Sequence, residues 1–401
     1  MKICLIVYKI DPVAGSENAS GYHLAKEIST QYPDTTIISR TDHIKKLKQD
    51  PHFASLNLIG LDVPKVFSFY KKGNRGIILY YYLWQITVGQ WIKKQTFDVI
   101  HQINFHADWA PHFIDNPESK MIWGPIAHHP ATPLSWLRYS SWSDYFKELT
   151  NRFVKNILWH INPYLYKAIK RADHIFFSHT DWPYPFRRKH HKIALQTYAG
   201  CHWPISAQSK SSDFSLLFVG RFVALKGPHV AMEAFARFLN ITQSKARMTF
   251  IGEGPLNDYL SKKAADINAV HPHAVTILPW QGRDDLIKFY QRAHFMLYPS
   301  IEAQGLVVSE AISQSCPVIT LNDTGPAFIA QHPALTVQCS DRSYSRCVDQ
   351  FSQKIIELFQ EYQSNPDKYS ELQHLTTERA HDLRWDVIAK KLMLAYGKHH
   401  D

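Results

Sequence analysis

The chain has 401 residues, of which 45% are hydrophobic and 20% charged, and its formal net charge is +10. This composition excludes a disordered or fibrous protein, and the length allows two domains of about 200 residues each rather than a single core. The whole basic excess lies in residues 1–200, where 25 Lys and Arg stand against 15 Asp and Glu, a difference of +10.

The most apolar stretch of the sequence is 76–92, which contains Gln85 and Gln90. It is shorter than the roughly 20 apolar residues that span a bilayer, so we expect a buried or interfacial helix. The opening residues read as a first buried strand and not as a signal peptide. Five cysteines without a C-x-x-C pair predict a cytosolic protein that has neither disulfides nor a zinc site.

Two basic clusters accompany this apolar stretch in the first half of the chain. They comprise Lys45, Lys46 and Lys48, and Lys71, Lys72 and Arg75. Cations close to apolar groups draw a protein to anionic lipid, so we expect peripheral association with the inner face of the plasma membrane. An ordinary solvated basic surface would explain the same charge. Nucleic acid is not favoured as a partner, because no DNA- or RNA-binding motif accompanies the basic residues.

The first half is predicted to alternate strands with helices. Strands are expected at 2–8, 36–39, 56–61, 98–102, 173–179 and 192–197, and a helix over 142–171 that is broken at Pro163. Residues 11–21 read as a small-residue loop between the first strand and a helix through 24–28. A small-residue turn between a strand and a helix could receive a polar ligand. The loop is not G-x-G-x-x-G, so a dinucleotide site is not favoured.

Periodicity is lost over residues 198–213, and 201–212 is the expected linker. The second half starts with a strand at 215–219, followed by Gly220, Arg221 and Lys226. A guanidinium and an ammonium group at the carboxyl end of a strand suit the negative charge of a diphosphate, although solvation of a turn explains them too. Further elements are predicted in the second half: strands at 248–251, 275–278 and 336–338, and helices at 344–362 and 384–396.

Residues 297–325 are predicted to form a strand, a loop with Glu302, a helix with Glu310 and a further strand. The carboxyl ends of parallel strands are where α/β sheets bind ligands. The backbone N–H groups of Gly305, Leu306 and Val307 at the helix start suit a phosphate. A pair of solvated acids near a helix start would explain the two glutamates equally well.

This stretch resembles the signature of glycosyltransferase family 4, which comprises retaining enzymes of the GT-B fold. The matching residues are Pro299, Ser300, Glu302, Gly305, Leu306, Glu310 and Ala311, with Gln304 where the family usually has Phe. Arg221 and Lys226 match a G-R-x-x-x-x-K-G motif of the family, and residues 252–255 resemble its G-x-G-P turn. Residues 120–133 look like a subgroup with W-G-P-I-G-G-G, in which His128 and His129 replace two glycines.

The resemblance implies an α/β protein of the GT-B fold, with two Rossmann-like parallel-sheet domains facing a central cleft. Residues 1–200 would bind the acceptor and residues 213–383 the nucleotide sugar, with a C-terminal helix at about 384–401 packing back on the first domain. Arg221 and Lys226 would stabilise the diphosphate, and Glu302 would lie near the sugar. The remaining residues expected in the site are Glu310, Gly305, Leu306, Val307, Gly220, Gly254, Gln281 and Arg283 for the nucleotide, and Gly15, Ser16, His128 and His129 for acceptor or sugar.

The expected activity is that of a retaining hexosyltransferase that moves a sugar from a nucleotide sugar to a saccharide or lipid-linked saccharide in bacterial surface polysaccharide assembly. A UDP-sugar is favoured over a GDP-sugar, and no cofactor is expected. No D-x-D sequence is present to hold a divalent ion, so a metal-independent reaction is predicted. Two alternatives remain, another GT-B enzyme such as a sugar-nucleotide epimerase, and a non-catalytic protein that binds nucleotide or membrane.

Overall fold

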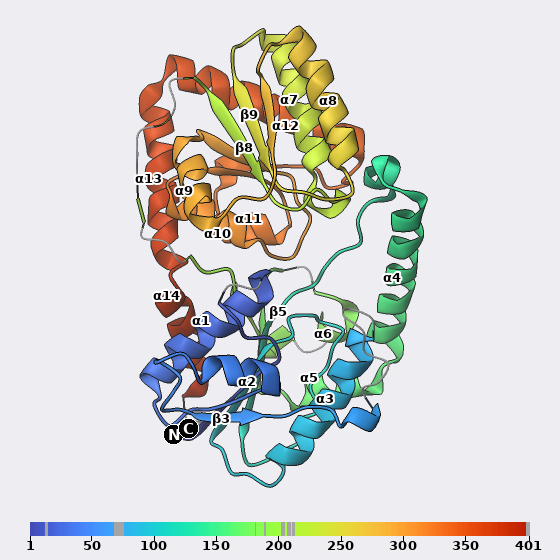
Figure 1. The fold of residues 1–401 in the computed structure, drawn as a ribbon, viewed down its shortest axis with the longest axis vertical. Helices are drawn as coiled ribbons and strands as arrows, with labels where there is room; N and C mark the ends of the chain where they lie inside the picture. Colours follow the sequence, from blue (N-terminus) through green and yellow to red (C-terminus); the bar gives the residue numbers. More distant parts are fainter. Residues whose placement is uncertain are drawn as a thin grey trace. The chain divides into compact units, whose positions relative to one another are not determined.

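A computed structural model describes residues 1–12, 15–67, 76–180, 182–187, 190–201, 205–206, 210 and 213–397. The chain forms two compact units (Figure 1). The first contains Met1–His128, Phe153–Tyr198 and Trp385–Asp401, and the second contains His129–Arg152 and Ala199–Arg384. The domain boundary predicted from the sequence, near residue 200, placed residues 129–152 in the first domain, whereas in the structure they belong to the second unit. Most of the expected linker lies outside the described residues, but Cys201 forms an isolated β-bridge with Arg384.

The first unit is built on a seven-stranded parallel sheet with the order β3-β2-β1-β4-β5-β6-β7. Its strands are β1 (Ile3–Val7), β2 (Thr36–Ser39), β3 (Asn57–Gly60), β4 (Val99–Asn104), β5 (Lys120–Ile126), β6 (His174–Phe177) and β7 (Ile193–Leu195). Every residue of β1, β2 and β4 is buried, as expected for central strands of a parallel sheet covered on both faces. The chain order reverses between β1 and β4, which is the doubly wound arrangement.

Helices of the first unit connect these strands. They are α1 (Gly15–Gln31), α2 (Thr41–Leu47), α3 (Ile77–Ile92), α5 (Pro163–Arg171), α6 (Tyr184–Arg187), α14 (Trp385–Met393) and the second part of α4 (Trp142–Ile161), which begins in the other unit. The C-terminal α14 packs beside α1 (Figure 1), where Trp385 stacks on His23 with ring centroids 5.0 Å apart. The hydroxyl of Tyr396 lies 2.6 Å from His101 Nδ1, which ties the end of the chain to β4.

The prediction of a small-residue loop over residues 11–21 is wrong for most of that range, because α1 begins at Gly15. A Cβ atom on Gly21 would lie 2.4 Å from the carbonyl oxygen of Lys9 and 2.6 Å from the side-chain nitrogen of Asn104. Glycine therefore lets the helix pack closely on the strand ends. The small residues that suggested a turn in the sequence instead allow this helix to pack closely on the sheet.

The second unit contains a six-stranded parallel sheet with the order β10-β9-β8-β11-β12-β13. Its strands are β8 (Ser215–Val219), β9 (Arg247–Ile251), β10 (Val275–Leu278), β11 (Phe295–Tyr298), β12 (Val318–Leu321) and β13 (Thr336–Val337). Its helices are α7 (Pro228–Thr242), α8 (Asn257–Val270), α9 (Arg283–Arg292), α10 (Leu306–Ser313), α11 (Gly325–Ala330), α12 (Tyr344–Ser364) and α13 (Pro366–Asp382). The chain order reverses between β8 and β11, so this unit is doubly wound as well.

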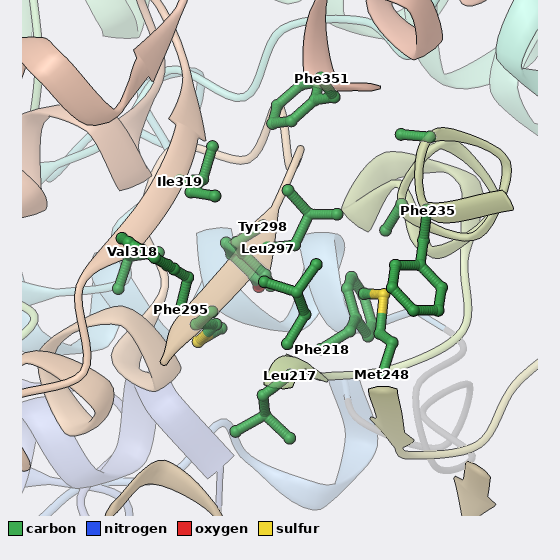
Figure 2. Close-up of a cluster of buried hydrophobic side chains, with 14 of the residues drawn as sticks. Leu217, Phe218, Phe235, Met248, Phe295, Leu297, Tyr298, Val318, Ile319 and Phe351 are labelled. Carbon is green, nitrogen blue, oxygen red and sulfur yellow. The ribbon is translucent and has the colours of Figure 1, made fainter. Parts of the chain in front are cut away.

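The core of the second unit lies between this sheet and its helices. Figure 2 shows Phe218 of β8 and Leu297 of β11 among the buried side chains, with Phe235 of α7 and Phe351 of α12 approaching from the helices. All four of these side chains are fully buried. Burial of a large apolar side chain contributes about 1.5–3 kcal/mol, so this cluster holds the strand ends in fixed positions.

The two Rossmann-like parallel sheets expected from the resemblance are confirmed. Helix α13 was not anticipated, although Asn365 marks its start by accepting a hydrogen bond from the Lys368 amide, and Pro366 occupies its first turn. Within the described ranges, no helix has the length and apolarity that crossing a bilayer requires.

Candidate functional site

Lys226, Tyr298 and Glu302 form a polar cluster at the carboxyl edge of the second sheet. The Nζ atom of Lys226 lies 2.9 Å and 2.8 Å from the two carboxylate oxygens of Glu302 and donates to the Tyr298 hydroxyl at 2.7 Å. Tyr298 in turn donates to Glu302 Oε1 at 2.5 Å. The side chains of Lys226 and Glu302 are 15% and 12% exposed. The ion pair is therefore largely removed from water but open on one side.

Backbone hydrogen bonds hold the loop that carries Glu302. The Ile301 amide donates to the Leu225 carbonyl at 3.1 Å, and the Gly325 amide donates to the Glu302 carbonyl at 3.1 Å. The Glu302 amide bonds the hydroxyl oxygen of Ser300 at 3.2 Å. These contacts join the segment after β8, the loop after β11 and the start of α11, so the cluster is positioned by backbone geometry.

Gly305 precedes α10 and touches the same cluster. Its φ of −165° is extended and open to any residue, but an added Cβ would lie 2.9 Å from Glu302 Oε1. A larger residue there would have to displace the Glu302 carboxylate. The first amides of α10, which include Leu306 and Val307, have no acceptor within the helix, and a helix start of this kind favours an anion.

Gly220 packs against the aliphatic part of Lys226, because an added Cβ on Gly220 would lie 3.2 Å from Lys226 Cδ. Arg221 follows Gly220 and its side chain is exposed. The turn at Gly254 packs closely on the segment after β8, since a Cβ on Gly254 would lie 2.7 Å from the Phe222 carbonyl oxygen. The structure thus brings Lys226, Glu302 and Gly305 together, whereas Arg221 is exposed in the segment that follows Gly220.

Glu310 lies in a second polar cluster on α10, where it accepts a hydrogen bond from the Tyr290 hydroxyl at 3.2 Å. Burial raises the pKa of the Glu310 carboxyl, while the positive charge of Arg283 at the start of α9 acts against that rise. Burial also raises the pKa of Tyr298 well above its usual range, and the negative charges of Glu302 and Glu310 act in the same direction. The two clusters therefore influence each other electrostatically. Gln281 lies just before α9, and its side chain donates to the Pro279 carbonyl at 2.9 Å.

The first unit places its expected site residues differently. Gly15 opens α1 with φ 64° and no atom close to an added Cβ, and Ser16 follows it in the helix, with its side chain outside the described residues. His128 Nδ1 lies 2.8 Å from Asp108 Oδ2. His129 begins the segment that belongs to the second unit, so the histidine pair is split between the units.

Two polar partners in the sites were missed by the sequence reasoning. Tyr298 reads as a core aromatic at the end of a buried strand, yet its hydroxyl bonds both charged groups of the first cluster. Asp108 is 20 residues from His128, and nothing in their spacing signals the pair. Among the described residues, no group of three or more His, Cys, Asp or Glu side chains is arranged to hold a metal ion.

The sequence of the second unit is similar to that of a known protein family. Residues 203–371 match the sequence model of a family described as glycosyl transferases group 1. The second unit is similar to these transferases. The match includes both clusters around Lys226 and Glu310.

Curated relatives and solved structures are also glycosyltransferases or share their fold. A D-inositol 3-phosphate glycosyltransferase of Acidothermus cellulolyticus is 35% identical over 114 residues, which is 26% of this chain and 25% of the relative. A lipopolysaccharide core biosynthesis glycosyltransferase of Rhizobium meliloti is 29% identical over 139 residues, 34% of this chain and 38% of the relative. The chain thus spans well under half the length of these relatives.

The fold similarity extends over the whole chain. A structure of Anabaena HepE in complex with UDP has a TM-score of 0.60 and 14% identity, covering 98% of this chain and 99% of that one. At this identity the likeness concerns the fold, and it confirms the expected GT-B class of two Rossmann-like domains.

Proposed function

We propose that the protein is a retaining, metal-independent glycosyltransferase of the family 4 type, which transfers a sugar from a UDP-sugar to a saccharide or lipid-linked saccharide. The observation that carries this proposal is the cluster of Lys226 with Glu302 and Gly305 at the start of α10, in a unit similar to group 1 transferases. The Rhizobium meliloti relative, named for lipopolysaccharide core synthesis, supports a saccharide acceptor and a role in surface polysaccharide assembly.

The diphosphate of the donor would bind at the first amides of α10 and at Lys226. Glu302 already neutralises much of the Lys226 charge at 2.8 Å, so Arg221 on the neighbouring surface would supply the second cation. The leaving diphosphate gains negative charge as its bond to the sugar breaks. Cations and helix amides placed beforehand stabilise that charge without a metal ion.

The sugar would lie next to Glu302. In the reaction the bond between the anomeric carbon and the diphosphate oxygen breaks, and its electron pair leaves with the diphosphate. A bond forms between the anomeric carbon and the acceptor oxygen, whose proton passes to the departing phosphate or to water. Retention follows either from departure and attack on the same face or from two successive inversions, and both routes use the same cationic stabilisation of the diphosphate.

The nucleoside would bind beside the second cluster. Glu310 would accept hydrogen bonds from the ribose hydroxyls, with Arg283 as its positive neighbour. Gln281 and the turn at Gly254 would contact the base and phosphate through backbone groups. The complex of HepE with UDP supports a uridine nucleotide.

The acceptor would be bound by the first unit through Gly15, Ser16 and His128, with His129, the next residue in the sequence, as a further contact. The paired Asp108 carboxylate fixes the orientation of His128, which suits a ring that hydrogen-bonds a sugar hydroxyl. A cytoplasmic enzyme at the inner membrane face would meet lipid-linked acceptors there, and the basic excess of residues 1–200 supports such a location.

Hydrolysis of donors without acceptor tests this proposal. A panel of UDP- and GDP-sugars is incubated with the full chain in the presence of EDTA, and free nucleotide is measured. Slow release of UDP from at least one UDP-sugar is the expected result. Binding of nucleotide sugars with no turnover, with or without candidate acceptors, would favour a binding protein, and absence of any binding would overturn the proposal.

A further inference from the structure

Helix α4 carries an apolar face that the protein leaves in water. Within the 20 residues of α4, none is buried. The exposed apolar side chains are Trp142, Phe146, Leu149, Phe153, Val154, Ile157 and Ile161. Most of them follow one another at intervals of three or four positions, which places them on one side of the helix. Exposed apolar surface of this extent marks a docking site.

The polar side of the same helix makes the contacts with the rest of the protein. Glu148 Oε1 accepts a hydrogen bond from the Thr132 amide at 2.9 Å, and Arg152 bonds both Glu148 and the Thr132 carbonyl. Farther along, the Trp159 ring lies 4.9 Å from the ring of His128. The usual arrangement of an amphipathic surface helix is thus inverted, since the apolar side faces away from these contacts.

The charge of this region indicates what the apolar face meets. Residues 142–171 contain six basic and two acidic side chains, a net charge of +4. The basic residues are Lys147, Arg152, Lys155, Lys167, Lys170 and Arg171, and the acidic residues are Asp144 and Glu148. The pair of Glu148 with Arg152 removes one charge of each sign and leaves the net charge of the segment unchanged. An apolar helix face in a segment of net positive charge, within a half of the chain whose net charge is +10, is complementary to an anionic lipid surface.

A cavity of about 260 Å³ lies in the first unit, between residues of α3 and of α5, the helix that follows α4 in the chain. Its walls include the apolar Ile86, Phe113 and Tyr164 and the ammonium groups of Lys93 and Lys167, with Asp115 bonded to Lys167 at 3.1 Å. Because Asp115 pairs with Lys167, these apolar walls carry one net positive charge, which suits the headgroup of an anionic lipid beside its hydrocarbon chain. This combination favours lipid over a second protein as the occupant.

We propose that the exposed face of α4 docks the protein onto an anionic lipid surface, with the helix lying in the plane of the interface. The helix is too polar to cross a bilayer, and its apolar stripe occupies one side, as interfacial helices require. This inference deepens the membrane association of the proposed function and names its surface. It does not depend on donor chemistry, because docking needs no nucleotide sugar.

Vesicle sedimentation tests the proposal. The full chain is mixed with vesicles of phosphatidylcholine containing phosphatidylglycerol, or of phosphatidylcholine alone. The test variant is Phe146→Gln with Phe153→Gln, at sites 63% and 68% exposed. The matched control is Ile241→Gln with Val270→Gln, at sites 66% and 70% exposed in the second unit. Melting curves show that each variant is folded, and donor hydrolysis without vesicles reports the proposed activity separately.

We expect wild type and control to bind the anionic vesicles, and the α4 variant to bind at least about tenfold more weakly. Binding to neutral vesicles should be weaker, and salt should reduce binding to anionic ones. Equal binding by the α4 variant and wild type, or no binding by wild type, would overturn the proposal. A dimer in solution that the α4 variant abolishes, without vesicle binding, would instead assign the face to a second copy of the chain.

Discussion

Lys226 and Glu302 form an ion pair with 2.8 Å between Nζ and Oε2, although 76 residues separate them in the sequence. The pair joins the segment after β8 to the loop after β11, and its two side chains are largely buried. Breaking a buried pair by removing one partner leaves an uncompensated charge. The pair therefore combines a structural contact with the charge that the proposed reaction needs.

Replacing Lys226 with alanine should lower kcat/KM for donor hydrolysis or transfer at least about 100-fold, because the diphosphate loses its buried cation. Steady-state kinetics with the preferred UDP-sugar measure the effect. Lys354→Ala is the matched control, since Lys354 pairs with Glu357 on α12 at 2.8 Å, within one helix, and should leave kcat/KM within about twofold. Full activity of the Lys226 variant would remove it from the site.

The Lys226 and Glu302 side chains should be energetically coupled in stability. Lys226→Met and Glu302→Gln should each destabilise the second unit, and the double variant should lose less than the sum of the two, by about 1–3 kcal/mol. Denaturant unfolding of the four proteins gives this coupling free energy. Strict additivity would mean that the ion pair is not formed in solution.

Gly305→Ala should impair activity with little loss of stability. The new methyl group would lie 2.9 Å from Glu302 Oε1 and would displace the carboxylate or the start of α10. Gly397→Ala offers a matched comparison outside the proposed site, because its φ of −44° suits alanine and the nearest atom to the added Cβ is 3.7 Å away. Kinetics and melting temperatures of both variants distinguish the two cases. Equal activity of the two would show that close approach at Gly305 has no functional role.

Ribose recognition by Glu310 can be tested with a modified ligand. Wild type should bind UDP more tightly than 2′-deoxy-UDP, by about tenfold, because the buried carboxylate loses a hydrogen-bond partner. The variant Glu310→Ala should bind both ligands with similar, weaker affinity. Calorimetric titration supplies the four affinities. An unchanged preference for UDP in the variant would assign the ribose to another residue.

Buried histidines should make the first unit less stable in acid. Burial lowers the pKa of His101 to about 4, against about 6.5 in the unfolded chain. The unfolded state therefore binds the proton first, and the stability contributed by neutral His101 is complete above pH 6.5 and is lost as the pH falls towards 4. At pH 5 the loss is about 2 kcal/mol. His101→Gln should flatten the decline in melting temperature between pH 7 and 5, whereas a parallel decline in both proteins would contradict the assignment.

Much of the fold follows from local sequence patterns. The strands of both sheets are short apolar runs bounded by turn residues, and the run 215–219 emerges as β8 with the same limits. The start of α1 at Gly15 could not be predicted from local sequence patterns. Gly15 and its small neighbours have turn composition, and the close contact of Gly21 with Lys9 and Asn104 depends on how the helix packs on the sheet.

The site was predictable in part. In the sequence Lys226 follows one predicted strand, and Glu302 and Gly305 follow another. These strands, β8 and β11, are neighbours in the parallel sheet, so their carboxyl ends lie side by side. The role of the Tyr298 hydroxyl could not be predicted, because a tyrosine ending a buried strand looks like a core residue. For α4, the periodicity of Phe146 and Phe153 indicates an amphipathic helix, but only the contacts of Glu148 and Arg152 show which side faces inward.

Binding of UDP to wild type and to Lys226→Ala, measured by calorimetric titration in EDTA, tests the central claim most directly. The account predicts a saturable wild-type affinity without metal and at least about tenfold weaker binding by the variant, while Lys354→Ala binds as wild type does. Equal UDP affinity in wild type and Lys226→Ala would contradict the claim that the Lys226 cluster at the start of α10 holds the diphosphate.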